Sequence, residues 1–508
     1  MEKKLFQAFA ISFVFLLIWS YILPKKNEVI QAPQESKSSG AVKKTDSSTT
    51  ALEQEAVIEE EPIELKEARI GNFLITYSPT GGYIKELVAN SDKKPLSFKN
   101  IGVIPSQIST QFSAQITEDR IIFNAPGAGK KEFVFEDNLL RIILGSEKGK
   151  TMEVFSNYLD EDMLDQRYQE LFYNQGRAIE RKYFSNRMLG LAGKGIQEGS
   201  LTNVEFAGAR GRYYCISLLK GSYDIKWEKA QYIPKDENAR GPKTKIILKL
   251  PQPDKETLVY LGPQAEKYLQ PFELQEVIYF GFFHLIGVFM TKVLYFFFSF
   301  TKNWGLSIIF FSSLTYLCLY PFTAKSMKAM RKIQQLQPEL EALKVKHKDS
   351  PEKLQKESIE FYRKHKINPA SGCLPLFFQL PVFMALYQVI FRLFALKGAN
   401  FLWISDLSQP DHLYQLPFTI PILNTNYFNL LPILVMILGF IQQKVSSPAS
   451  ATGSQQQKSM GLFMTVFIGF IFYNFPSALV LYWFTQNIFT ITFQAKLAKA
   501  KNTTPAKA

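Results

Sequence analysis

Hydroxyl groups crowd the middle of an otherwise apolar segment, which reads NWGLSIIFFSSLTYLCLYPFT from Asn303. Within about one and a half helical turns, the hydrocarbon run Ile308–Phe311 is followed by Ser312, Ser313, Thr315 and Tyr316. An unsatisfied polar group in hydrocarbon costs several kcal/mol. These groups must therefore either hold water and polar ligands inside a membrane or hydrogen-bond one helix to another.

A cluster of carboxylates offers a second candidate chemistry, because glycosidases work with two of them. The stretch DEDMLDQ contains Asp160, Glu161, Asp162 and Asp165. No histidine accompanies them, and such clusters usually lie on solvated loops. We therefore expect no catalysis there, whereas a sugar- or partner-binding surface in this part of the chain stays open.

The three cysteines, Cys215, Cys318 and Cys373, are too widely spaced to suggest a metal set, a redox pair or a disulfide framework. We expect three buried, unreactive thiols, no metal and no cofactor. The chain of 508 residues carries a formal charge of +14, which is typical of proteins that bind nucleic acid or an anionic membrane. The location of the charges must decide between the two.

The first membrane signal is an uncharged run from residue 5 to residue 23, preceded by Lys3 and Lys4. The run is longer than the core of a signal peptide, and no small-x-small cleavage site follows it. It predicts an uncleaved transmembrane anchor at 1–24. Residues 25–65 are rich in Ser, Thr, Lys and Glu, which predicts a disordered tether.

Residues 66–270 contain short β-branched and aromatic runs divided by turn residues. The runs are NFLITYSP, RIIFNAPG, KEFVFED, LLRIILG, RYYCISLL, YDIKWEKAQYI, TKIILKL and TLVYLG. Their spacing predicts an all-β sandwich of antiparallel strands.

From Glu276 onward the chain has the composition of a membrane protein. Five spans are predicted at about 305–322, 371–394, 427–445, 460–475 and 477–494. Lys292 interrupts the preceding apolar block, which either crosses the membrane as well or lies in its interface; we expect an interfacial amphipathic helix over 271–303.

The distribution of charge orients these spans, because basic excess in short loops marks the cytoplasmic side. The loop 325–366 carries twelve basic and six acidic residues, and the tail after Gln494 carries four lysines and no acid. We expect both termini in the cytoplasm, residues 25–303 on the opposite side of the membrane in the periplasm, a membrane-spanning core at 304–494 and a basic cytoplasmic tail at 495–508.

The basic loop predicts a helical hairpin over 325–366, with Ser350 as N-cap and Pro351 at the first helical position of its second helix. Its charges either fix the topology and contact lipid headgroups or bind a cytosolic partner such as a ribosome. The candidate contact residues are Lys328, Arg331, Lys332, Lys344, Lys346, Lys348, Lys496, Lys499 and Lys501.

Several motifs closely resemble those of the YidC membrane protein insertases of Gram-negative bacteria, which are relatives of the Oxa and Alb insertases. They are NWGLSII, LYPFT, MRKIQQLQPELEALK, INPASGCLPLFFQLPVFMALYQV, FLWISDLS and FPSALVLYW, and they cover about 300–495. The resemblance implies insertion of nascent membrane proteins into the bilayer, alone or beside the Sec translocon, with no enzymatic activity and no small-molecule substrate. It also implies a periplasmic β-supersandwich and five spans around a hydrophilic groove.

The groove candidates implied by the resemblance come from three spans: Ser312, Ser313, Thr315, Tyr316, Gln379, Gln388, Tyr482, Gln486 and Asn487. Tyr316 occupies the position where the bacterial family usually has an arginine, and no lysine or arginine occurs between Gly305 and Phe322. Arg392 is expected to snorkel at the outer end of its span.

Two other classes of function compete with this interpretation. A secondary transporter would require intramembrane ionisable residues and an internal repeat, and the sequence shows neither. A membrane-anchored periplasmic binding protein would leave the 305–494 block without a role.

Overall fold

The computed structural model describes residues 64–502 except 72, 90–95, 146–150, 159–169, 177–178, 184–197, 233–242, 252, 254–255, 348–349, 366–373, 422, 424 and 447–454. The predicted anchor, nearly all of the predicted tether, the acidic cluster 160–165 and Cys373 lie outside the described residues. The chain forms two compact units, which we call the β unit (Met1–Pro263 with Lys267–Val277) and the helical unit (Gln264–Glu266 with Ile278–Ala508).

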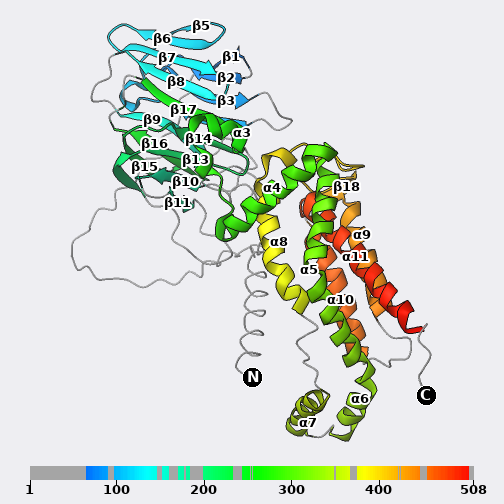
Figure 1. Ribbon diagram of the computed structural model, residues 1–508. Helices are drawn as coiled ribbons and strands as arrows, with labels where there is room; N and C mark the ends of the chain where they lie inside the picture. Colours follow the sequence, from blue (N-terminus) through cyan, green and yellow to red (C-terminus); the bar gives the residue numbers. More distant parts are fainter. Residues whose placement is uncertain are drawn as a thin grey trace, which may run out of the picture. The chain divides into compact units, whose positions relative to one another are not determined.

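The β unit consists of antiparallel strands in two sheets (Figure 1). One sheet has the order β1-β2-β3-β4-β9-β16-β15-β12 and the other β11-β10-β13-β14-β17-β8-β7-β6-β5. Their bounds are β1 Lys66–Ile70, β2 Phe73–Ser78, β3 Tyr83–Ala89, β4 Leu96–Ile101, β5 Ser113–Ile116, β6 Arg120–Ala125, β7 Gly129–Glu136, β8 Leu139–Leu144, β9 Met152–Tyr158, β10 Glu170–Asn174, β11 Ile179–Tyr183, β12 Gly199–Val204, β13 Phe206–Arg210, β14 Tyr214–Leu218, β15 Tyr223–Tyr232, β16 Lys243–Leu250 and β17 Glu256–Pro263. All eight runs that the sequence indicated form strands.

A single apolar core joins the two sheets. Tyr77 of β2 packs edge-on against Phe123 of β6 with ring centroids 5.8 Å apart, and Tyr173 of β10 stacks on Trp227 of β15 at 5.7 Å. Each of these pairs bridges from one sheet to the other, and burying one such side chain contributes about 1.5–3 kcal/mol. Cys215 is buried here, which raises the pKa of its thiol to about 12.

An ion cluster fixes the segment through which the chain leaves the β unit. This segment contains the short helix α3 (Glu266–Leu269) and the 3-10 turns Gln270–Phe272 and Gln275–Val277. Arg210 donates to the carbonyl oxygen of Val277 at 2.7 Å, and Arg181 donates to that of Glu276 at 2.7 Å. Both guanidinium groups pair with the fully buried carboxylate of Glu170.

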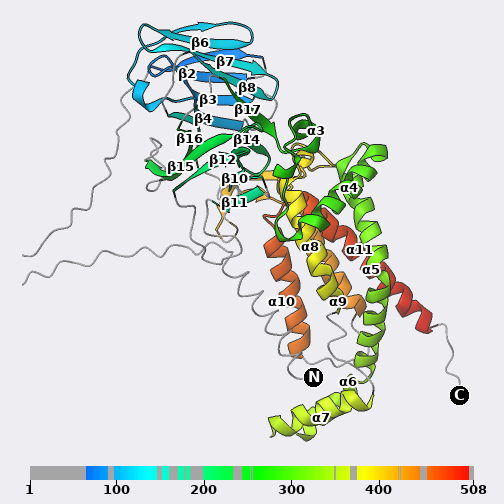
Figure 2. The ribbon, with the colours of Figure 1, turned by 60° about the vertical axis from the view of Figure 1, so that its left-hand side comes forward.

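The helical unit contains α4 His284–Thr301, α5 Trp304–Gln335, α6 Gln337–Lys346, α7 Pro351–Lys364, α8 Leu374–Arg392, α9 Leu430–Ser446, α10 Gln455–Phe472 and α11 Ser477–Asn502 (Figures 1 and 2). A short hairpin, β18 Tyr414–Ile420 and β19 Thr425–Phe428, precedes α9. The core of the helical unit includes residues of α4, α5, α8, α9 and α11, and Leu294, Val389 and Tyr482 are fully buried in it. Among the described residues, two helices are long and apolar enough to cross a membrane, Gly281–Thr301 and Trp304–Ala329.

Two predicted boundaries are wrong. The helix expected from residue 271 begins only at His284, because Gly281 takes a positive φ of 71° and 3-10 turns precede it. The helix expected to end near Phe322 instead continues through Pro321 to Gln335 as one element of 32 residues. Cys318 is also exposed rather than buried.

Candidate functional site

Polar side chains from α5, α8 and α11 meet inside the helical unit. The side-chain amide of Gln379 donates to the hydroxyl of Tyr482 at 2.6 Å, and that of Gln486 donates to the carbonyl oxygen of Ser312 at 2.9 Å. Tyr482 and Gln486 are four residues apart and therefore share one face of α11. We call the group Ser312, Tyr316, Gln379, Tyr482 and Gln486 the polar cluster.

The hydroxyls of α5 are satisfied within their own helix. Ser312, Ser313 and Thr315 donate to the carbonyl oxygens four residues earlier, at 2.7, 2.8 and 2.8 Å. A hydroxyl that donates in this way keeps its oxygen lone pairs as acceptors. The half-buried Ser313 and Thr315 can therefore still accept hydrogen bonds from water or a polar ligand, whereas Ser312 is fully buried.

Tyr316 lies beside these hydroxyls on α5. Its ring stacks on Phe489 of α11 with centroids 5.2 Å apart, and only 9% of the residue is exposed. Its buried hydroxyl has no hydrogen-bond partner among the described residues. An unmet hydroxyl of this kind costs about 1–3 kcal/mol, so it marks a place where a polar group from outside the chain would be stabilised.

Two other predicted residues of the site lie on different helix faces. Gln388 follows Gln379 by nine residues, which is half a turn around α8, and its buried Oε1 has no partner among the described residues. Asn487 is half-buried and lies about 100° around α11 from Gln486. The structure therefore joins four of the nine predicted residues, Ser312, Gln379, Tyr482 and Gln486, by hydrogen bonds between helices, with Tyr316 one turn beyond Ser312 on α5. Ser313 and Thr315 lie about 100° and about 60° around α5 from Ser312, on either side of it.

Arg392 does not snorkel as expected. It is 7% exposed, and its guanidinium donates to the backbone carbonyl oxygen of Tyr279. This contact joins the end of α8 to the segment before α4. Sequence reasoning missed it because nothing in a lone arginine at a helix end indicates which carbonyl it will reach.

A second group of polar residues, also missed from sequence, lies at the loops between the helices. Oδ2 of Asp411 accepts a hydrogen bond from the backbone N–H of Leu431 in the first turn of α9, at 2.7 Å. Asn429 donates to the carbonyl oxygen of Tyr473 at 2.7 Å, and Ser477 donates to that of Gln409 at 2.6 Å. These bonds hold the adjoining ends of α9, α10 and α11. One of these residues could have been found from the sequence, because Asn429 stands directly before α9 and asparagine is typical of helix N-termini.

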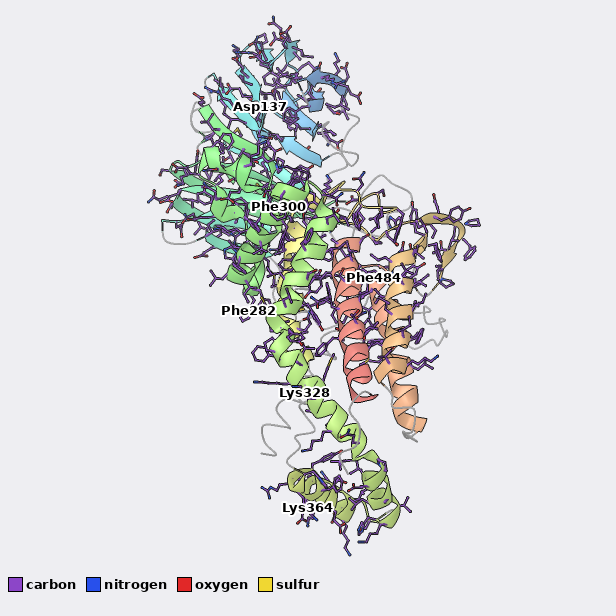
Figure 3. The ribbon with its side chains drawn as sticks, turned by 45° about the vertical axis from the view of Figure 1, so that its right-hand side comes forward. Asp137, Phe282, Phe300, Lys328, Lys364 and Phe484 are labelled. Atoms are coloured by element: carbon purple, nitrogen blue, oxygen red, sulfur yellow. The ribbon has the colours of Figure 1, made fainter. Side chains whose placement is uncertain are left out.

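The basic hairpin consists of α6, α7 and the extension of α5 (Figure 3). Two histidine–glutamate pairs join α6 and α7, His347 with Glu357 at 3.0 Å and His365 with Glu339 at 3.9 Å. The helix α7 begins at Pro351 after Ser350, as expected, but the Ser350 hydroxyl makes no cap hydrogen bond.

Three of the predicted contact residues on this hairpin, Lys328, Lys332 and Lys346, have exposed side chains. The side chains of the remaining six lie outside those that the structure describes: Arg331, Lys344, Lys348, Lys496, Lys499 and Lys501. In Figure 3, Lys328 lies where α5 leaves the other helices and Lys364 lies at the far end of the hairpin. The hairpin thus presents several separate positive charges to solvent.

The described residues contain no group of three His, Cys, Asp or Glu side chains that could hold a metal ion. The site therefore consists of neutral hydroxyls, amides and aromatic rings. The helix α5 that carries part of it continues into the solvent-exposed basic hairpin.

Comparison with known proteins connects this site to a family. Residues 296–504 match the family model described as 60Kd inner membrane protein. The membrane protein insertase YidC of Chlamydia caviae is 37% identical over 265 residues, which cover 47% of this chain and 33% of the relative. The YidC of Endomicrobium trichonymphae is 32% identical over 263 residues, covering 50% of this chain and 49% of the relative.

The chain thus spans between a third and a half of the length of these curated relatives. Among solved structures, a crystal structure of an active YidC insertase with its first transmembrane domain resolved is 18% identical. It has a TM-score of 0.42 and covers 85% of this chain and 94% of its own.

Proposed function

The chain belongs to the YidC family through residues 296–504, and from that premise we propose that it is a membrane protein insertase. It moves hydrophobic segments of nascent inner-membrane proteins into the bilayer, alone or beside the Sec translocon. The polar cluster, with Ser313 and Thr315, lines the hydrophilic groove in which a substrate's polar segment is held. The proposal depends above all on the buried hydroxyl of Tyr316, which has no partner among the described residues.

A neutral polar wall is sufficient for this task. A substrate's short polar segment would lose several kcal/mol for each unsatisfied group in hydrocarbon. The hydroxyl oxygens of Ser313 and Thr315 remain available as acceptors, and Gln379 and Gln486 contribute amides. The groove therefore works through hydration and hydrogen bonding, without the fixed positive charge that bacterial relatives usually carry at this position.

The rest of the architecture follows from the same proposal. The helices α5, α8, α9, α10 and α11 form the five core spans, α4 lies in the membrane interface, and the β unit is a periplasmic supersandwich. Residues 1–24 form the anchor and 25–65 the tether. The basic hairpin and the lysine-rich tail lie in the cytoplasm, where their charges contact ribosomes that translate membrane proteins.

A photo-crosslinking experiment tests the groove. A photoreactive phenylalanine at Tyr316 should capture a nascent membrane protein while it is being inserted. The matched control is Phe463 of α10, whose side chain is 63% exposed and which lies away from the polar cluster. Capture at Phe463 with none at Tyr316 would place the substrate path elsewhere.

A further inference from the structure

The hairpin β18–β19 carries aromatic side chains that the rest of the described residues do not cover. Alternate residues of β18 are apolar, namely Tyr414, Leu416, Phe418 and Ile420, and Phe428 of β19 pairs directly with Tyr414. Directly opposed residues share a face across the pair, so Tyr414 and Phe428 lie together. The register of the pair shifts between Gln415 and Ile420, and the polar residues of β18 are Gln415 and Thr419.

Leu416 and Ile420 are half-buried, whereas Gln415, Pro417 and Thr419 are exposed, so it is the two aromatic rings of β18 that lie uncovered rather than a whole apolar face. Tyr414 is 64% exposed and Phe418 is 61% exposed, and Leu413 beside them is 41% exposed. No charged residue occurs anywhere from 413 to 443. A two-stranded hairpin is marginally stable in water, so an uncharged one with outward aromatic rings needs an apolar environment of its own.

The base of the hairpin is fixed to the ends of apolar helices. Only Asn429 separates β19 from α9, and Asn429 is bonded to Tyr473 at the end of α10. Near the other end of the hairpin, the side chain of Asn474 donates to the carbonyl oxygen of Leu423 at 2.9 Å. The hairpin therefore stays beside the ends of α9 and α10, on the side of the helical unit away from α6 and α7 (Figure 1).

We propose that this hairpin is a membrane-interface anchor, with Tyr414 and Phe418 inserted at the boundary between headgroups and acyl chains of the outer leaflet. The inference rests on the proposed membrane location of α9 and α10. Three observations identify lipid as the occupant: the hairpin is continuous with an apolar helix, it has no charge, and its outward residues are the aromatic and aliphatic types that populate membrane interfaces. A strand face that bound a soluble partner would be rimmed by charged residues.

The test measures depth in the bilayer. Cys215, Cys318 and Cys373 are replaced by serine, and a new cysteine carrying the environment-sensitive dye NBD is placed at Phe418 or, as the control, at the polar residue Gln415. The full chain is reconstituted in lipid nanodiscs with and without a phospholipid spin-labelled at carbon 5 of its acyl chain. We expect the dye at 418 to emit at shorter wavelength and to be quenched about twofold or more relative to the dye at 415, because the aromatic positions enter the bilayer and the polar position does not.

A second pair of variants separates anchoring from misfolding. With the dye at position 414, Phe418→Asp should abolish the quenching, whereas Thr419→Asp at the neighbouring polar position should preserve it. Unquenched, water-like emission at both 418 and 415 would overturn the proposal. So would an emission shift at 418 that appears only after the Sec channel is added, since the face would then bind protein. None of these readouts requires insertion activity, so they are independent of the crosslinking result at Tyr316.

Discussion

At the scale of single residues, two tyrosines of the same site differ in what their hydroxyls do. The hydroxyl of Tyr482 accepts a hydrogen bond from Gln379 and is fully buried. The hydroxyl of Tyr316 is buried without a partner among the described residues. One hydroxyl therefore joins α8 to α11, whereas the other makes no bond among the described residues and is the group that we propose to face the substrate.

This difference predicts opposite outcomes for the same chemical change. Tyr482→Phe leaves the amide of Gln379 without its acceptor and should lower the stability of the helical unit by about 1–3 kcal/mol. Tyr316→Phe removes no bond within the chain and should change neither stability nor insertion appreciably, because neighbouring hydroxyls and amides still hold water. Thermal unfolding in detergent measures the stability of the two variants, and rescue of insertion in depleted cells measures their activity. Equal destabilisation by the two variants would contradict the assignment of roles.

The buried ion cluster of the β unit gives a second prediction at this scale. Glu170→Gln leaves Arg181 and Arg210 with one charge partner fewer in a water-free site, which should cost about 3–5 kcal/mol. The control is Glu256→Gln, whose carboxylate pairs with Arg141 at 2.8 Å on the surface, with both side chains more than a third exposed. That change should cost about 0–1 kcal/mol. Pulse proteolysis of the full chain in urea measures the free energy of unfolding of both variants. Comparable losses of stability would mean that the cluster is effectively hydrated.

At the scale of elements, the hairpin α6–α7 is a candidate for electrostatic binding. Lys346, Lys353 and Lys356 are exposed, so replacing them with glutamine should weaken binding to ribosomes without changing the fold. The binding of the unmodified chain should also weaken as salt rises through physiological ionic strength. Co-sedimentation with translating ribosomes at several salt concentrations measures this.

The matched control changes the opposite charges on the same hairpin. Glu352 and Glu360 are exposed on α7, and their replacement by glutamine should strengthen binding. If neither set of substitutions alters ribosome binding or insertion, the basic residues serve only to fix topology and to contact lipid headgroups.

Sequence patterns predict individual elements better than they predict contacts between them. Strand runs such as TKIILKL and the start of α7 at Pro351 depend on local alternation and backbone preference, and both were predicted. The end of α5 was not, because a proline normally ends a helix, whereas here the helix continues through Pro321. The family resemblance likewise indicated polar positions on three helices. It could not identify which side chains meet, since Gln379 and Tyr482 are 103 residues apart.

At the scale of the whole molecule, the proposed topology predicts which surfaces a reagent can reach. In a chain without its native cysteines, single cysteines at Lys220 and Gly398 should react with a membrane-impermeant maleimide in intact spheroplasts. Cysteines at Lys346 and Lys444 should react only after lysis. All four positions are exposed, so access to the compartment alone decides the outcome. Labelling at 220 only after lysis would place the β unit in the cytoplasm and would make α4 a full membrane span.

The uncharged wall of α5 has a further consequence for the direction of transfer. A groove with a fixed cation favours acidic substrate segments, whereas one with Tyr316 at that place treats both signs of charge alike. The membrane voltage then distinguishes acidic from basic segments, because it changes the free energy of moving a charge across the membrane by about 2.3 kcal/mol per elementary charge for every 100 mV. With the outer side positive, an acidic segment is drawn outward and a basic one is held back. Under the proposed function, the asymmetry of the finished membrane proteins would thus come from the membrane voltage rather than from a charge in the proposed groove.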